Sequence, residues 1–196
     1  MSLLPHIAIF TDNASRKMEL ARQLLSGRPP EELSFLNGRK GGLFSNTRIG
    51  SFLEEEARHD ESGLLPDGGR KLATYSSGER KKALLRFLLS QSPDFLILDN
   101  VFDNLDRQFS VQLRSDLEEI SKTIILIQFL SRAEDLLSFI RQKAFLHITQ
   151  LHGFPDYKPS GIQVSGSTPV LQGSLPPAPS PIHVKAEILV LSLIHI

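Results

Sequence analysis

Short apolar runs alternate with stretches of helical periodicity along residues 1–152. HIAIF (6–10) is an apolar run of strand length, and in the segment that follows it Leu20, Leu24 and Leu25 fall on one helical face. Strands that alternate with helices favour a parallel sheet covered on both faces, so we predict an α/β fold. The later strand-like runs lie at 95–98, 123–128 and 144–151, and the later helical patterns begin at 76 or cover 107–121 and 132–142.

The helix that begins near residue 76 has recognisable ends. Ser76 and Glu79 form a capping-box pair, and the apolar residues that follow recur at helical spacing. Pro93 ends the helix, because proline cannot continue the backbone hydrogen-bond ladder. The run FLIL (95–98) that comes next is typical of a strand buried on both faces.

The composition changes abruptly near residue 153. Seven of the 12 prolines and four of the 13 glycines fall within 153–181, so we expect a linker there. The run IHVKAEILV (182–190) alternates like a strand and suggests the start of a second, truncated domain. The last six residues, LSLIHI (191–196), look like the translation of a common sequencing adapter, and we leave them out of fold reasoning. A genuine apolar C-terminus is the alternative.

Charge and cysteine content exclude several classes of function. The chain has 22 basic and 22 acidic residues, so nothing draws it as a whole to nucleic acid or to an anionic membrane. The absence of cysteine excludes disulfides and cysteine-based zinc sites, and it suits a reducing cytoplasm. No apolar run approaches the roughly 18–20 residues of a membrane span, and the N-terminus lacks a signal-peptide pattern. We therefore expect a cytoplasmic globular protein that does not itself span a membrane and has no nucleic-acid partner.

The spacing of three polar motifs identifies a family resemblance. YSSGE (75–79), followed by a basic helix, resembles the signature motif, usually written LSGGQ, of ATP-binding cassette (ABC) ATPases. Asp99 lies 23 residues after Ser76 and Asp106 seven residues after Asp99, as the Walker B and D-loop aspartates do in that family. The resemblance implies a P-loop NTPase-like parallel sheet flanked by helices. Only 59 positions separate Lys17 from Ser76, so the helical subdomain is expected to be shortened.

The chemistry of these residues agrees with the resemblance. Ser76, Ser77, Gly78 and Glu79 are placed at a helix N-terminus, where unpaired amides and the helix dipole favour an anion such as a phosphate of ATP. A glycine there lets the backbone approach phosphate oxygens closely. Asp99, at the carboxyl end of a buried strand, would hold Mg²⁺, through water. The alternative is an ordinary capped helix joined to a core strand.

A second resemblance covers the strand, loop and helix at the start of the chain, which overlay the Walker A pattern G-x-x-x-x-G-K-S/T. Lys17 falls on the P-loop lysine and Asn13 on a position where the family often has asparagine. Thr11 and Arg16 replace the two glycines, and Met18 replaces the hydroxyl residue that binds Mg²⁺. We interpret this loop as a decayed Walker A motif. An unrelated strand, turn and helix with a solvated lysine is the alternative.

Three further positions depart from the family. Asn100 stands where the catalytic glutamate is expected, and a neutral amide can orient a water but cannot take its proton near pH 7. Gln128 or Phe129 occupies the position of the switch histidine, and Ser45 or Asn46 that of the Q-loop glutamine.

The remaining charged residues and the histidines are not expected to take part in a site. The six histidines show no metal-ligand spacing. Two charged runs are interpreted as solvated or surface helix faces, with a nucleic-acid patch as the alternative for the basic run: Arg80, Lys81 and Lys82, and Glu54, Glu55 and Glu56.

The resemblance implies that cassettes work in pairs, because the Walker motifs of one and the signature of the other enclose each ATP. Residues 76–79 match the part that acts on the partner's ATP, whereas Lys17, Asp99 and Asn100 belong to a damaged site of the chain's own. The leading hypothesis is a degenerate cassette that binds ATP and Mg²⁺ at a composite interface and completes or regulates a partner's site, with weak or no hydrolysis in its own. Whether the chain is itself an enzyme stays open.

The linker and the strand-like run after it suggest a second cassette on the same polypeptide, similar to the tandem-cassette ATPases associated with molybdate transport in bacteria. A dimer of separate cassettes is the other arrangement. If the chain serves a membrane permease, it is expected to be peripheral to the inner membrane. Two alternative functions remain: an active ABC ATPase that energises a permease, and an interaction domain that kept the ABC fold and lost nucleotide.

Overall fold

The computed structural model describes residues 4–59, 63–64 and 70–153. Contacts divide the chain into two units, of which the first, Met1–Ser131 with Asp135–Tyr157, contains the sheet and all the described α-helices. Of the second unit, Arg132–Glu134 with Lys158–Ile196, only Arg132–Glu134 is described. The expectations for the linker, for the second domain and for the last six residues lie outside the described residues.

Six strands form one sheet in the order β2-β3-β4-β1-β5-β6. All neighbouring pairs are parallel except β5 and β6, which are antiparallel. The predicted α/β fold with a parallel sheet is therefore confirmed, with one antiparallel strand added at an edge. The strands are β1 (Ile7–Thr11), β2 (Gly41–Ser45), β3 (Phe95–Asp99), β4 (Ile125–Leu130), β5 (Gln142–His147) and β6 (Gln150–Gly153).

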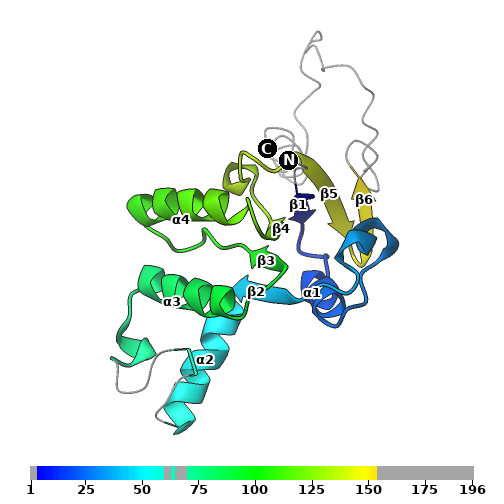
Figure 1. Ribbon diagram of the computed structural model, residues 1–196. Coiled ribbons are helices and arrows are strands. Elements are labelled where there is room, and N and C mark those ends of the chain that lie inside the picture. Colours follow the sequence, from blue (N-terminus) through cyan, green and yellow to red (C-terminus); the bar gives the residue numbers. More distant parts are fainter. Residues whose placement is uncertain (1–3, 60–62, 65–69, 154–196) are drawn as a thin grey trace, which may run out of the picture. The chain divides into compact units, whose positions relative to one another are not determined.

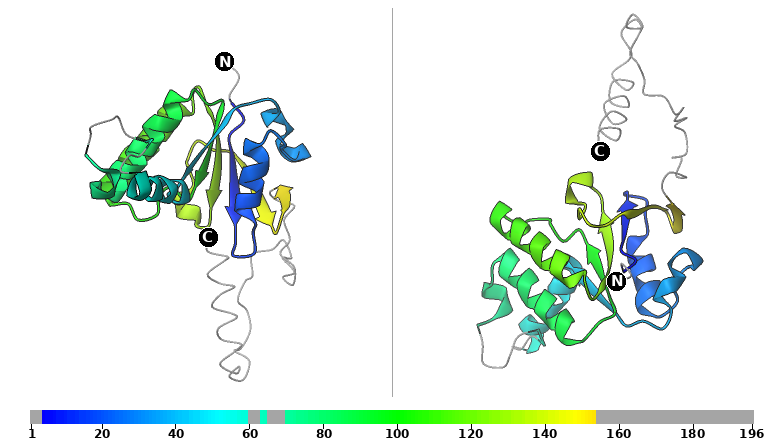
Figure 2. Two further views of the ribbon diagram at one scale, coloured as in Figure 1. Left: turned by 90° about the horizontal axis from the view of Figure 1, so that it is seen from below. Right: turned by 45° about the horizontal axis from the view of Figure 1, so that its top comes forward.

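Helices cover both faces of the sheet. One face carries α1 and a 3-10 turn, η1, and the other carries α2, α3 and α4 (Figure 1; the left view of Figure 2 shows the two layers from below). The α-helices are α1 (Lys17–Leu25), α2 (Asn46–His59), α3 (Ser77–Ser90) and α4 (Arg107–Ile120), and the 3-10 turns are η1 (Glu31–Leu36), η2 (Leu72–Thr74) and η3 (Ala133–Asp135).

Alternation along the buried strands produces two hydrophobic cores. In β3, Leu96 and Leu98 pack with the α2–α4 layer, whereas Phe95 and Ile97 pack with α1 and η1. Successive side chains of a strand point to opposite faces, so a fully apolar run is what a strand covered on both sides requires. All five residues of β3 are buried.

The predicted helix at 132–142 is wrong. The structure has only the short turn η3 there, and the chain then runs on without helix to β5. The buried side chain of Gln128 explains this, because it bonds the following backbone in place of helical partners. Its Nε2 donates to the Asp135 carbonyl (2.7 Å) and its Oε1 accepts from the Leu137 amide (3.1 Å).

The single strand predicted over 144–151 is a hairpin of β5 and β6. Ile148 and Thr149 form its turn, and Ile148 adopts a φ of 53°. A left-handed conformation is unusual for a β-branched residue, and such outliers often mark functional or tightly constrained places. Apolar alternation alone could not reveal the turn, because the run contains none of the usual turn residues.

Candidate functional site

The carboxyl ends of β1, β3 and β4 meet at one edge of the sheet, where open α/β sheets carry their ligand sites. Lys17, the first residue of α1, reaches across this edge to Asp99, the last residue of β3. The Lys17 Nζ lies 2.7 Å from the Asp99 Oδ1, and Asp99 is only 8% exposed. The two residues predicted to hold phosphate and Mg²⁺ are therefore brought into direct contact with each other.

The loop between β1 and α1 uses its backbone amides internally. The Asp12 amide donates to the Ser15 hydroxyl (2.9 Å), the Ala14 amide to the Asp12 carboxylate (2.9 Å) and the Ser15 amide to the Asp12 carbonyl (3.2 Å). The Arg16 amide donates to the carbonyl of Ile148, at 2.7 Å. A phosphate-binding loop offers such amides to its ligand. Here four of them already have protein acceptors.

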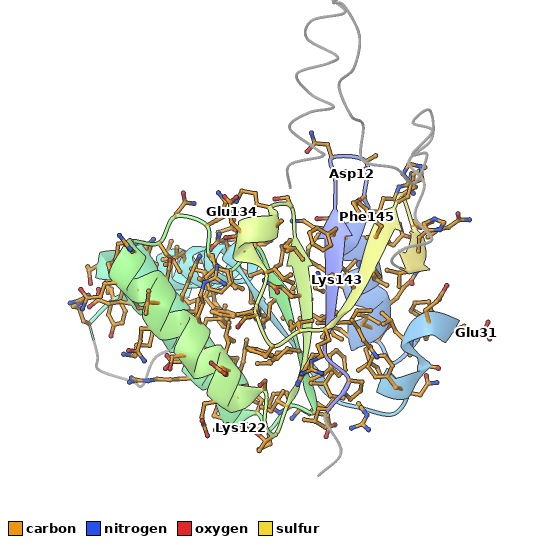
Figure 3. The ribbon with its side chains drawn as sticks, turned by 90° about the horizontal axis from the view of Figure 1, so that it is seen from above. Asp12, Glu31, Lys122, Glu134, Lys143 and Phe145 are labelled. Atoms are coloured by element: carbon orange, nitrogen blue, oxygen red, sulfur yellow. The ribbon has the colours of Figure 1, made fainter. Side chains whose placement is uncertain are left out.

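Asp12 gives this loop a negative charge of its own (Figure 3 shows it at the carboxyl end of β1, with Lys122 at the opposite end of the sheet). Partial burial acts to raise the pKa of Asp12, but hydrogen bonds from the Ser15 hydroxyl and from nearby amides, with the charge of His147, outweigh it and lower that pKa. The carboxylate is thus ionised at neutral pH. It accepts hydrogen bonds that an incoming phosphate would otherwise accept.

The β5–β6 turn closes over the same loop. Besides the bond from the Arg16 amide to the strained Ile148, the Ser15 hydroxyl lies within hydrogen-bond distance of the Leu146 carbonyl. α1 begins after Arg16, which supplies no side-chain cap. Contacts to the hairpin therefore hold the two residues that precede the helix, which itself has no side-chain cap.

A nucleoside triphosphate with Mg²⁺ does not fit this loop as it stands. Four amides of the loop are occupied, and the carboxylate of Asp12 would repel an anion. Thr11 is buried with its hydroxyl donating to the Leu130 carbonyl (3.4 Å), and the thioether of Met18 is a poor ligand for a hard cation. Asn13 is exposed in the loop.

The residues at the other positions expected to be catalytic make structural contacts within the fold. Asn100 has a φ of 44°, a conformation that asparagine tolerates better than most residues, and its amide donates to the Phe129 carbonyl (3.2 Å). The Phe129 side chain is fully buried in the core beneath α1, and Gln128 holds the backbone after β4. Ser45 is buried and its hydroxyl accepts the Arg48 amide (3.1 Å), so it caps α2.

Asn46, the other candidate for the Q-loop position, is exposed as the first residue of α2. Its neighbour Ser45 pairs in register with Asp99, so both lie at the same sheet edge as the Lys17–Asp99 pair. The two residues differ in their surroundings. Ser45 is buried and held in place by its capping bond, whereas the side chain of Asn46 is exposed to solvent.

The turn before α3 has the geometry predicted from its sequence. The Ser76 hydroxyl accepts from the Glu79 amide (3.2 Å) and the Glu79 carboxylate accepts from the Ser76 amide (2.7 Å), which completes the capping box. The bonds from Ser76, with the neighbouring Arg70, lower the pKa of Glu79. Ser76, Ser77 and Glu79 are exposed. The amides of Ser77 and Gly78, in the first turn of the helix, have no acceptor within it.

Gly78 is required by packing in addition to any ligand. A β-carbon built there would lie 2.8 Å from the Phe109 ring of α4, so the two helices touch at this point. The Ser77 hydroxyl donates to the Asn104 carbonyl (3.0 Å), and the Asp106 carboxylate caps α4 by accepting the Phe109 amide (2.7 Å). The signature-like turn and the segment that ends in Asp106 thus lie side by side.

Two buried charges behind this turn were missed from the sequence. Glu56, expected on the surface, is 6% exposed, and its carboxylate accepts the amides of Leu72 (2.6 Å) and Ala73 (2.9 Å) in η2. Lys81, expected on a solvated face, is 3% exposed and donates to the carbonyls of Val101 (2.7 Å) and Asp103 (2.6 Å). Both interpretations of the charged runs are wrong at these residues.

Arg80 also departs from a freely solvated position. Its guanidinium donates to the carbonyls of Leu72 (3.1 Å) and Ala73 (2.6 Å), the same residues whose amides Glu56 accepts. The 3-10 turn that leads into Ser76 is therefore held on both its amides and its carbonyls. Every third or fourth residue of α2 and α3 that faces inward could have been flagged by helical phase, and Glu56 is in phase with Ile49 and Phe52.

The predicted site residues fall into two groups. The first group lies at the carboxyl ends of the parallel strands and at the starts of α1 and α2, and the second lies in and beside the first turns of α3 and α4, two helices that cover one face of the sheet (Figure 1). None of the helices described has the length and apolar character needed to cross a bilayer. Within the described ranges, no three acidic or histidine side chains gather as a metal site.

Comparisons with known proteins agree with this geometry. No protein-family model matches the chain. The energy-dependent translational throttle protein EttA of Escherichia coli K12 is 36% identical over 63 residues, which is 32% of this chain and 11% of EttA. The chain therefore matches only about a tenth of that relative's length.

A solved structure extends the comparison to most of the chain. A metal-chelate type ABC transporter in an inward-facing conformation superposes with a TM-score of 0.53 at 14% identity, over 76% of this chain and 71% of that one. Neither protein is of the molybdate-associated tandem type, so the comparisons support the coarser resemblance only. The described part of the chain has the α/β, P-loop NTPase-like fold of an ABC ATPase cassette.

Proposed function

We propose that this chain is a degenerate ABC cassette that completes or regulates the ATP site of a partner cassette and hydrolyses little or no ATP at its own. One contrast carries the proposal. Four amides of the loop 12–16 are bound to protein groups, whereas the turn 76–79 is capped and firmly supported, with Ser76, Ser77 and Glu79 exposed.

The chain's own site lacks the groups that hydrolysis needs. Asn100 cannot accept a proton from water near pH 7, and loss of a positioned general base typically costs about 10²–10⁴-fold in rate. Lys17 and Asp99 neutralise each other, and Met18 offers no hydroxyl to Mg²⁺. Because MgATP does not fit the loop as it stands, we derive no step through nucleotide at this site.

The turn before α3 keeps the means to meet an anion held by another protein. The free amides of Ser77 and Gly78 and the positive end of the helix dipole favour a phosphate. Lys17 and Asp99 lie away from this turn, so any ATP and Mg²⁺ that it meets must be held by a partner. A second cassette, on the same polypeptide or a separate one, is the partner that we propose.

Direct titration of the full chain with MgATP tests the first half of the proposal. We expect no calorimetric binding at micromolar ATP and no phosphate release above background. Tight binding and hydrolysis by the chain alone, both abolished by Lys17→Ala, would instead support an active ATPase that energises a permease.

Complementation tests the second half. A chain that carries Thr11→Gly, Arg16→Gly, Met18→Thr and Asn100→Glu has the two glycines, the Mg²⁺-binding hydroxyl and the catalytic carboxylate of the family pattern, and Ser76→Arg added to it blocks its own signature turn. We expect this chain alone to be inactive and to hydrolyse ATP when the natural chain is added. The natural chain with only Ser76→Arg is the matched control and should give no stimulation.

The remaining alternative predicts a different pattern. An interaction domain without nucleotide would leave ATP hydrolysis at background in every mixture. To separate that outcome from a restored loop that fails, the four-substitution chain without Ser76→Arg is assayed alone, since it carries both halves of a site. Activity there, with no stimulation in the mixture, would refute the proposed role.

A further inference from the structure

Lys81 is the one lysine that the structure describes as buried. It lies one turn beyond the signature-like turn on α3, and its Nζ donates to two main-chain carbonyls, those of Val101 and Asp103. Two of its three N–H donors are thereby used, and the ammonium is shielded from solvent. Lys81 is therefore not positioned to bind a phosphate, and its role must lie in what it holds.

The segment that it holds is a turn whose Val101 and Phe102 side chains are buried but whose backbone adopts two left-handed conformations. Asn100 and Asn104, at its two ends, both have left-handed backbone conformations, with φ of 44° and 58°. One backbone bond closes the turn, from the Asp103 amide to the Asn100 carbonyl (3.1 Å). The carbonyl of the buried Val101 depends on a partner, because an unpaired carbonyl away from water is costly.

A second contact from the same helix reaches this segment. The Ser77 hydroxyl donates to the Asn104 carbonyl, and Gly78 allows the Phe109 ring to rest against α3. Three carbonyls between residues 101 and 104 are thus bound by side chains of α3. Of the three bonds, the two from Lys81 are the more shielded, since one is buried and the other part-buried, whereas the bond from Ser77 is exposed.

We propose that Lys81 is a positioning residue that fixes the segment 100–106 against the first turn of α3, so that the turn 76–79 and Asp106 form one rigid surface. The geometric part of this inference stands on the contacts of the chain alone. The statement that the rigid surface acts on a partner rests on the proposed function.

The test compares Lys81→Met, which keeps an unbranched chain and loses the donors, with Lys82→Met, which removes the same charge from an exposed neighbour. Amide hydrogen exchange of the full chain is followed for 100–106, with β4 as the internal reference. We expect exchange in 100–106 to rise about tenfold or more in Lys81→Met, with β4 unchanged, and neither to change in Lys82→Met. Equal protection of 100–106 in all three proteins would overturn the proposal.

A measurement on the natural chain covers the case in which Lys81→Met does not fold. The ammonium protons of a shielded lysine that donates to two main-chain carbonyls exchange slowly enough to be followed by ¹⁵N NMR, whereas the ammonium protons of solvated lysines exchange too fast. We expect one protected lysine side chain, assigned to Lys81 by its loss in Lys81→Arg. Rapid exchange at every lysine would also overturn the proposal.

The link to the partner is read separately. In the complementation mixture, the substitution is made in the otherwise natural chain. Lys81→Met is expected to lower the stimulated rate of ATP hydrolysis about tenfold, because the surface that meets the partner is no longer held in position, whereas Lys82→Met leaves that rate unchanged. If amide exchange in 100–106 rises in Lys81→Met but the natural chain gives no stimulation in the mixture, the positioning role of Lys81 stands and the proposed function is rejected. Full stimulation by Lys81→Met would show that the contacts of Lys81 are not needed for action on the partner.

Discussion

Two helix N-termini of this molecule resemble phosphate-binding elements, and they are built in opposite ways. At α1, protein acceptors occupy four amides of the loop that precedes the helix, and Asp12 and the Ile148 carbonyl are among them. At α3, Glu56 and Lys81 hold the flanking segments from the protein interior, and Ser76, Ser77 and Glu79 of the capped first turn stay exposed.

The comparison separates loss of a ligand site from loss of structure. α1 remains a well-packed helix with Leu20, Ala21 and Leu24 buried, although its loop is closed. A helix start can therefore lose anion binding without losing stability, because internal acceptors replace the ligand. The reverse arrangement at α3 keeps donors free only because buried polar groups support the turn.

The largest effect is expected from removing the support beneath α3. Glu56→Ala leaves the buried amide of Leu72 and the amide of Ala73 without their acceptor and should lower the free energy of unfolding by about 3 kcal/mol. Urea denaturation measures this. Glu55→Ala, at the exposed neighbouring position, should change the value by less than about 0.5 kcal/mol. A comparably small effect at both positions would show that the support is not needed.

A close contact between helices should give the next largest effect. Gly78→Ala adds a β-carbon 2.8 Å from the Phe109 ring, and we expect a loss of about 1–3 kcal/mol in stability from overpacking. Gly50→Ala is the matched control, because a β-carbon there meets nothing within 4 Å. It should stabilise α2 by about 0.5–1 kcal/mol. Thermal unfolding of both variants gives the sign directly.

A pH experiment distinguishes the buried lysine from an exposed one. Burial, partly offset by Asp103 and Asp135, lowers the pKa of Lys81 from 10.5 to about 8. Between these two values the unfolded chain binds more protons at this residue than the folded chain, so its contribution to stability rises with pH. Relative to Lys81→Met, the natural chain should gain about 1–2 kcal/mol between pH 7 and 9.5.

The two hydrogen bonds from Lys81 to main-chain carbonyls should persist over that change of pH. A neutral amine keeps two N–H groups, which is the number of carbonyls that Lys81 binds. Lys82→Met supplies the reference, because its exposed ammonium should give no such slope below pH 9.5. A flat difference between the natural chain and Lys81→Met would mean that the lysine is solvated.

The smallest effect on stability is expected at the closed loop. Asp12→Ala frees the Ala14 amide on an exposed surface, so we expect a loss of about 1 kcal/mol or less. Amide exchange is the sharper measurement: it should rise at Ala14, while Asp12→Asn, which retains an acceptor oxygen, largely preserves protection. Unchanged exchange in Asp12→Ala would show that the carboxylate does not close the loop.

Periodicity and motif spacing were sufficient for most of the fold. The apolar run at 95–98 and the capping box at Ser76 predicted β3 and the start of α3 closely, because both signals are local. The prediction of a helix over 132–142 was wrong because the side chain of Gln128, in the strand just before the segment, bonds the backbone of the segment. The helical spacing of apolar residues carries no information about a side chain that competes with the helix for backbone hydrogen bonds.

The candidate site was predictable in its residues but not in its contacts. The sequence placed Lys17 and Asp99 in one site, and the structure joins them. It could not show that Ile148 would supply an acceptor to the loop, since that contact joins segments 132 residues apart. The burial of Lys81 was missed for another reason: its place in a charged run outweighed its helical phase with the buried residues Leu84 and Leu88.

The burial of Phe129 has a consequence for any attempt to introduce a histidine at this position. Its ring is fully enclosed among apolar side chains, in register between Ile9 and Asp99. A histidine placed there would carry a polar ring into a dry core and leave its nitrogens without partners, at a cost of a few kcal/mol. A single Phe129→His substitution is therefore expected to destabilise the fold, and the surrounding core would have to be remodelled before a histidine could be accommodated.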